Sequence, residues 1–229
     1  MRNLVLNSSS ALHGYGYMDH CETAVRDLFD GCCVVFVPWA LHDLDAYTST
    51  VGARFEKMGI ELVGVHTFDD PVVAVNEADG VFVGGGNTFR LLTRLHDSGI
   101  SGAIRERVGK GMPYMGSSAG TNVACPTIMT TNDMPIVQPP TFEALDLVPF
   151  QINPHYQDPD PGSTHKGETR EDRIREYHEM NTHPVVGLRE GGWLRVRGDE
   201  IRLEGLSGAR IFRRDAEPEE AEPGAELVL

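Results

Sequence analysis

The alternation of short apolar runs with amphipathic segments constrains the fold of this chain more than any other feature. Runs rich in Val, Ile and Leu recur through the first half, and segments with apolar residues at helical spacing separate them. This order predicts an α/β fold with a mostly parallel sheet and helices on both faces. The expected strands are residues 3–7, 33–37, 60–65, 80–83, 113–115, 150–153, 185–188, 193–196 and 201–203. The expected helices are residues 20–29, 47–58, 88–96, 103–108 and 168–180.

Length and composition place most of the chain in one domain. The 229 residues suffice for a substantial core, and the size fits one α/β domain better than two. We expect a single domain over residues 1–214. Residues 215–229 are acidic and contain proline, and we expect them to form a solvated tail that takes no part in the chemistry.

Charge and cysteine content restrict the partners and the compartment. A net charge of −14 argues against nucleic acid or an anionic membrane as a partner, because both require a basic face. No apolar run approaches 20 residues and no signal-peptide pattern is recognised, so we expect a cytoplasmic protein. The four cysteines form no Cys-x-x-Cys pair and have no metal-ligand spacing with the histidines. We therefore expect reduced thiols, and neither disulfides nor structural zinc.

A Gly-x-Ser-x-Gly turn marks Ser118 as a candidate nucleophile. Gly116 and Gly120 flank it between an apolar run and a helical segment starting near residue 121. Such a turn pushes the serine out of the sheet, and the helix N-terminus supplies N–H groups and a positive dipole end. The alternative is a Ser/Gly turn that caps a helix or binds a phosphate.

A second glycine-rich loop follows the expected strand at 80–83. Gly84-Gly85-Gly86-Asn87-Thr88 opens a helix, so its N–H groups point at any anion above the sheet edge. The loop is a candidate phosphate site, or half of an oxyanion hole in which Gly86 acts with Ala119. A dinucleotide site is disfavoured because the Gly-x-Gly-x-x-Gly spacing is absent.

His155 is the candidate base for Ser118, since it follows an expected strand and an Asn-Pro step. Two acids are candidates to orient it: Asp133, in an irregular segment, and Glu190, in a Glu-Gly-Gly turn after a strand. We favour Glu190, because a short turn after a buried strand presents a fixed carboxylate. Either acid is alternatively a solvated turn residue.

Arg170 precedes Ile174 by one helical turn and shares its inward face. An inward arginine needs a carboxylate. It pairs either with an acid of the protein or with a carboxylate of the substrate.

Five motifs together resemble the peptidase E family of α-aspartyl dipeptidases: residues 84–89, 114–122, 131–137, 151–155 and 165–170. The resemblance implies a flavodoxin-like fold related to class I glutamine amidotransferases, with serine in place of their cysteine. It implies no metal or cofactor, and dipeptides with an N-terminal aspartate as substrates. A monomer or homodimer is expected.

By position, the resemblance implies that Ser118 is the nucleophile and His155 the base, with the N–H groups of Gly86 and Ala119 as oxyanion donors. Arg170 matches an arginine associated with the substrate aspartate. Both Asp133 and Glu190 fall in family motifs, so the third triad member stays open. Asp133 is also a candidate for the substrate's amino group if Glu190 completes the triad.

The chain departs from the family pattern at Ser117, where a tryptophan is expected, and this affects local packing. The loop 157–167 is expected to act as a lid, and its Asp158 and Asp160 would oppose an acidic substrate if they faced the site. Two alternative functions are a cyanophycinase-like serine hydrolase and a non-catalytic flavodoxin-like binding module.

Overall fold

The central sheet of the protein has seven strands in the order β3-β2-β4-β5-β1-β8-β9. A computed structural model describes residues 1–160, 162, 164 and 166–229. Strands β3, β2, β4, β5 and β1 are parallel, and β8 and β9 extend the sheet in antiparallel fashion. The strands are β1 (Asn3–Asn7), β2 (Cys33–Val37), β3 (Glu61–Gly64), β4 (Gly80–Val83), β5 (Tyr114–Ser117), β8 (Gly192–Arg197) and β9 (Glu200–Gly205).

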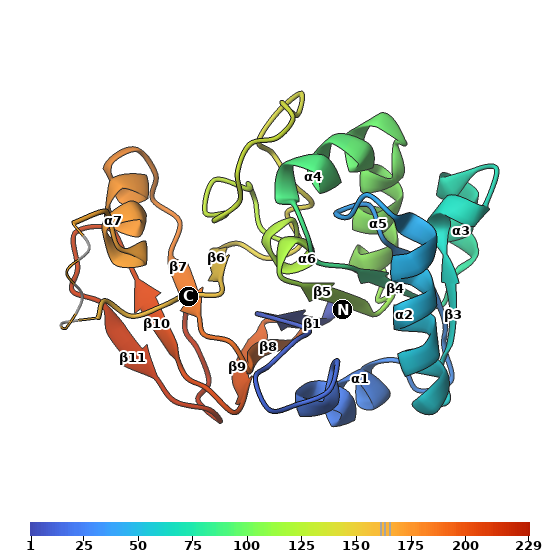
Figure 1. The fold of residues 1–229 in the computed structure, drawn as a ribbon, viewed down its shortest axis with the longest axis horizontal. Helices are drawn as coiled ribbons and strands as arrows, with labels where there is room; N and C mark the ends of the chain where they lie inside the picture. The colour runs from blue at the N-terminus through green and yellow to red at the C-terminus, as the bar shows by residue number, and fades with distance from the viewer. Residues whose placement is uncertain (161, 163, 165) are drawn as a thin grey trace.

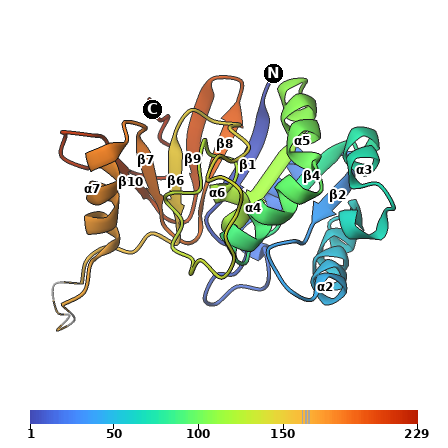
Figure 2. The same ribbon diagram turned by 90° about the horizontal axis from the view of Figure 1, so that it is seen from above.

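Helices cover both faces of this sheet (Figures 1 and 2). Successive side chains of a strand point to opposite faces. Leu4 and Leu6 accordingly pack in the cluster that holds α3, α4 and α5, while Val5 packs with α1 and α2. The predicted α/β class is confirmed. The helices are α1 (Glu22–Leu28), α2 (Leu44–Lys57), α3 (Pro71–Glu77), α4 (Thr88–Asp97), α5 (Ile100–Gly109), α6 (Ala119–Asn122) and α7 (Arg170–Met180), with 3-10 turns at Asp19–Cys21 and Val65–Thr67.

A second sheet, absent from the predicted architecture, lies beside the first in the order β11-β10-β7-β6. Strands β6 and β7 are parallel, and β10 and β11 add to β7 in antiparallel fashion. Helix α7 packs on it through Ile174, which lies in one apolar cluster with Val185 and Phe212. Another continuous apolar cluster contains residues of both sheets. The strands are β6 (Gln151–Pro154), β7 (Val185–Leu188), β10 (Ala209–Phe212) and β11 (Glu219–Ala221).

The expectation of a solvated C-terminal tail is wrong. Strand β11 pairs with β10. Leu227 is buried in the main core, and its backbone N–H donates a hydrogen bond to Ile201 O. The acidic composition suggested a solvated segment, but two glutamates of β11 pair with arginines: Glu220 with Arg189 and Glu219 with Arg213. Within the described part of the chain, no helix is long and apolar enough to cross a membrane.

Candidate active site

Ser118 occupies a strained turn between β5 and α6. Its backbone angles are φ 52° and ψ −111°, a positive-φ conformation that residues with a side chain seldom adopt. The turn is held by the Ser118 N–H, which donates to Asn7 O, and by the Ser118 carbonyl, which accepts from the N–H groups of Thr121 and Asn122. The chain thereby places the half-buried Ser118 side chain at the carboxyl end of the parallel strands, as the motif predicts.

Gly116 permits the tight return of the chain into α6. A Cβ at this position would lie 2.5 Å from Gly120 O and 2.7 Å from Thr121 N, closer than any side chain tolerates. The spacing of the two glycines around Ser118 is therefore a steric requirement of the turn.

His155 and Glu190 come from the second sheet and meet Ser118 across the boundary between the two sheets. They follow β6 and β7, whose last residues, Pro154 and Leu188, are paired in register. His155 Nε2 lies 2.8 Å from Ser118 Oγ, and His155 Nδ1 lies 2.6 Å from Glu190 Oε1. This is the geometry of a nucleophile, a base and an orienting acid.

Ser8 supports the base, and the sequence reasoning missed it. The His155 N–H donates to Ser8 Oγ at 2.9 Å, and that hydroxyl donates to Leu188 O at 2.8 Å. Ser8 thus connects β1 to the ends of both strands that present His155 and Glu190. A signal was available, because Ser8 directly follows an expected parallel strand, and such strand ends gather at one sheet edge.

Asp133 does not contact His155. Its Oδ2 accepts hydrogen bonds from Thr88 at the start of α4. Both residues line a small cavity of about 20 Å³ that also reaches Ser118 and His155. The space suits a single small group such as a carbonyl oxygen. Of the two candidate acids, Glu190 therefore binds the histidine, and Asp133 lines the cavity at Ser118.

Two amide groups belong to the turns expected to hold an oxyanion. Ala119 N opens α6, and Gly86 N belongs to the loop after β4. A Cβ on the neighbouring Gly85 would lie 3.1 Å from Ser118 Cβ, so this loop packs directly on the serine. Within the described residues, neither amide donates a hydrogen bond to the protein. Both are therefore available to a ligand oxygen.

Arg170 is the first residue of α7 and is half-buried, but it does not line the cavity at Ser118. It lines a neighbouring hollow with Asp158 and Asp160. Burial and the charge of Arg173 lower the pKa of Arg170, while Asp133 raises it. Within the described residues it makes no ion pair with a carboxylate.

Ser117 is buried, and its Oγ lies 2.6 Å from Ser10 Oγ. The segment after β1 therefore contributes to the packing where a tryptophan was expected.

The expected lid at residues 157–167 stays a prediction, because three of its residues, Pro161, Ser163 and His165, lie outside the described residues.

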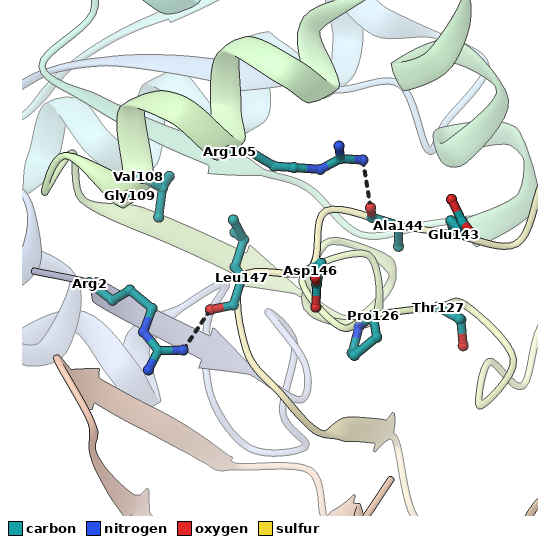
Figure 3. A pocket seen from close by; sticks show the side chains of 10 residues that line it. All are labelled: Arg2, Arg105, Val108, Gly109, Pro126, Thr127, Glu143, Ala144, Asp146 and Leu147. Atoms are coloured by element: carbon teal, nitrogen blue, oxygen red, sulfur yellow. Dashed lines mark hydrogen bonds between the residues drawn. The ribbon is translucent and has the colours of Figure 1, made fainter. Parts of the chain in front are cut away.

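A larger cavity lies at the opposite end of the central sheet (Figure 3). Its volume is about 560 Å³, and Arg2, Arg105 and Leu147 are among its lining residues. Arg2 precedes β1, whereas Ser118 follows the carboxyl end of β5. Both arginines donate to backbone carbonyls, Arg2 to Leu147 O and Arg105 to Ala144 O. The cavity is thus separate from the Ser118 site. Among the described residues, no His, Cys, Asp or Glu side chains gather as a metal-ligand group.

Comparison with known proteins identifies the family of the chain. The family model of Peptidase family S51 matches residues 4–204. The chain is 56% identical over 226 residues to a Streptomyces coelicolor protein named "Peptidase E", covering 98% of this chain and 93% of that protein. It is 51% identical over 232 residues to the "Probable alpha-aspartyl dipeptidase" of Drosophila melanogaster, covering 100% and 97%.

A solved structure of a peptidase from an acI-B1 actinobacterium has the same fold. It superposes with a TM-score of 0.74 at 16% identity, covering 100% of this chain and 97% of the other. The fold and the serine-centred site thus define a serine hydrolase of the α/β type. The chain belongs to peptidase family S51, and the resemblance to peptidase E is confirmed.

Proposed function

We propose that this protein is a serine-type dipeptidase that hydrolyses dipeptides with an N-terminal aspartate. The continuous contact from Ser118 Oγ through His155 to Glu190 carries the proposal. The names of its relatives, peptidase E and α-aspartyl dipeptidase, support the substrate class.

In the proposed first step, Ser118 is the nucleophile. His155 Nε2 accepts the Ser118 hydroxyl proton, and Oγ attacks the carbonyl carbon of the peptide bond. The resulting oxyanion accepts hydrogen bonds from the N–H groups of Gly86 and Ala119. The C–N bond then breaks, and His155 donates its proton to the leaving amine. Glu190 holds the Nδ1–H of His155 and stabilises the imidazolium.

In the second step, water replaces the amine. His155 takes a proton from the water, whose oxygen attacks the aspartyl ester carbon. The ester bond breaks, Ser118 regains its proton from His155, and free aspartate leaves.

Recognition of the aspartyl residue is assigned to two charges. Asp133 would bind the α-ammonium group and Arg170 the β-carboxylate in bidentate geometry. The half-buried position of Arg170 near Asp133 supports this division.

We also propose that the protein works in the cytoplasm, which fits its four unpaired cysteines, all within the described residues.

A dipeptide panel tests the proposal. Asp-Leu should be cleaved, and Glu-Leu, Asn-Leu, isoaspartyl-Leu and N-acetyl-Asp-Leu should be poor substrates. Ser118→Ala should fold normally and lose activity by up to about 10⁶-fold in kcat. Arg170→Met should lose about 10²-fold in kcat/KM on Asp-Leu and much of its preference over Asn-Leu. Release of aspartate-arginine units from an arginine-branched aspartate polymer would instead favour the cyanophycinase-like alternative.

A further inference from the structure

The contact between His155 and Glu190 requires support from outside the pair. Their side chains are 36% and 49% exposed. Ion pairs this exposed hold a geometry weakly, because water competes for both partners. The His155 backbone has φ 53°, a left-handed value that neighbouring contacts must maintain.

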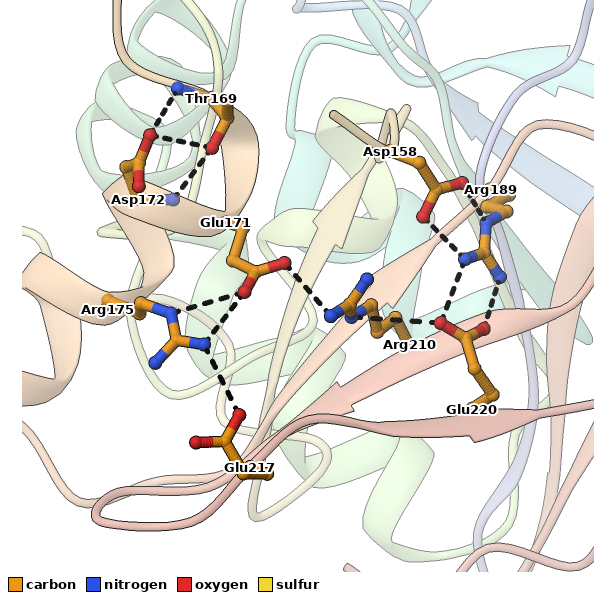
Figure 4. A network of polar contacts seen from close by, with 9 residues as sticks. All are labelled: Asp158, Thr169, Glu171, Asp172, Arg175, Arg189, Arg210, Glu217 and Glu220. Carbon is orange, nitrogen blue, oxygen red and sulfur yellow. Dashed lines mark hydrogen bonds and ion pairs between the residues drawn. The ribbon is translucent and has the colours of Figure 1, made fainter. Parts of the chain in front are cut away.

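Arg189, which directly precedes Glu190 in the chain, belongs to a network of ion pairs (Figure 4). Its Nε and Nη2 donate to both carboxylate oxygens of Asp158, at 2.8 and 2.7 Å. Its Nη1 and Nη2 donate to the carboxylate of Glu220, at 3.0 and 3.3 Å. The guanidinium also lies 5.8 Å from the centre of the Tyr156 ring. A planar arginine can hold two carboxylates in this way, and a lysine cannot.

These partners lie next to the proposed catalytic residues in sequence. Asp158 and Tyr156 belong to the segment that follows His155, and Arg189 directly precedes Glu190. Arg189 therefore joins the segment bearing the base to the turn bearing the acid. The Arg189 side chain is 23% exposed, while Asp158 and Glu220 are 47% and 51% exposed, so the paired geometry of these bonds, rather than burial, favours a fixed arrangement.

The same network reaches helix α7. Glu220 also faces Arg210, and Arg210 pairs with Glu171 at 3.1 Å. Glu171 follows Arg170 at the start of α7, and it binds Arg175 one turn further on. The network thus connects the ends of β6 and β7 with the helix that carries the proposed substrate-binding arginine.

We propose that Arg189 is a positioning residue that holds His155 and Glu190 in register through its paired contacts to Asp158 and Glu220; this inference rests on the proposed function. The contacts also neutralise Asp158, whose pKa Arg189 holds below its usual range. Asp158 therefore does not oppose an acidic substrate as a free charge. Glu220, from the C-terminal segment, becomes part of the support for the active site.

Steady-state kinetics on Asp-Leu test the proposal. For Arg189→Met we expect kcat to fall by about 10²-fold with KM nearly unchanged, because the base is misplaced while the substrate-binding charges remain. The kcat of Arg189→Lys should lie between those of wild type and Arg189→Met. Raising NaCl should lower the kcat of wild type and leave that of Arg189→Met unaffected, since salt screens the network. Arg202→Met is the matched control, because Arg202 pairs with Glu200 and Glu226 and touches none of these residues.

A second readout is independent of turnover. Nitrogen NMR of the imidazole rings reports which His155 nitrogen carries the proton. Wild type should show a proton fixed at Nδ1, and Arg189→Met a mixture of tautomers. An unchanged His155 signal together with unchanged kcat would overturn the inference, even if the variant were less stable. If Ser118→Ala remained active, the proposed function would fail, and the NMR comparison would still decide the role of Arg189.

Glu220→Gln covers the case in which Arg189→Met does not fold. It removes one charge at a side chain that is 51% exposed and leaves Asp158 bound to Arg189. A smaller fall in kcat in the same direction supports the proposal. A wild-type kcat and a wild-type His155 signal for both Glu220→Gln and Arg189→Lys would contradict it.

Discussion

Gly120 packs directly against the carbonyl group of Val83, so that a Cβ on Gly120 would overlap the Val83 oxygen. This contact presses the turn that carries Ser118 against the end of β4. It lets two adjacent parallel strands deliver the serine and the glycine-rich loop to the same point. Backbone contact between the two turns thus holds the glycine-rich loop beside Ser118.

Gly120→Ala should therefore be destabilising, by at least about 1–3 kcal/mol, because the obstacle is backbone and cannot rotate away. Gly102→Ala is the matched control. Gly102 lies in α5, and no heavy atom lies within 4 Å of the point where an alanine methyl would sit, so alanine should stabilise by about 0.5–1 kcal/mol. Urea unfolding of both variants measures the difference. Equal free energies of unfolding for the two variants would show that the turn at Gly120 can rearrange to accommodate a methyl group.

Glu190→Gln should lower kcat by up to about 10⁴-fold with little change in KM. The amide keeps the shape of the side chain but no longer stabilises an imidazolium or fixes the tautomer. Steady-state kinetics on Asp-Leu measure the effect, with Glu179→Gln, on the exposed side of α7, as the control. A loss of less than tenfold would exclude Glu190 from the proposed triad.

Asp133→Asn should mainly raise KM. The asparagine oxygen can still accept the hydrogen bonds from Thr88, so the loop remains in place while the negative charge is lost. The increase in KM should be large for Asp-Leu and small for substrates without a charged amino group. A fall in kcat comparable to that of Ser118→Ala would instead give Asp133 a role in the chemistry.

Leu227→Ala should lower the free energy of unfolding by about 2–5 kcal/mol, because it leaves a cavity in the main core. Leu227 is 8% exposed, whereas the adjacent Val228 is 84% exposed. Val228→Ala is therefore the control and should change stability by less than about 0.5 kcal/mol. Thermal unfolding of the pair is the measurement. Similar midpoints would mean that the C-terminal segment contributes little to the fold.

Strands buried on both faces were predictable to the residue. Cys33–Val37 and Val185–Leu188 read as continuous apolar runs, and such runs have distinct ends. Helix Pro71–Glu77 was missed because its β-branched valines resemble a strand, although Asp70 caps it before a proline. Strand Glu219–Ala221 was missed because an acidic run is typical of solvated chain. The neighbouring strand that stabilises it could not be identified from the sequence.

The candidate site residues were named from motifs, but the contacts among them were not predictable. The motifs left the choice between Asp133 and Glu190 open, because it depends on the pairing of β6 with β7. In that register, Pro154 lies opposite Leu188, and the next residues bring His155 close to Glu190. The positions of Ser8 and Arg189 likewise depend on contacts between segments far apart in the chain.

Ser118 is carried by one sheet, and His155 and Glu190 by the other. The turn that bears Glu190 runs from β7 in the second sheet to β8 in the central sheet, so both contacts of His155 lie at the seam between the sheets. In the proposed mechanism, a substitution at this seam, far from the reacting groups, changes the catalytic rate through these two distances without altering any reacting group.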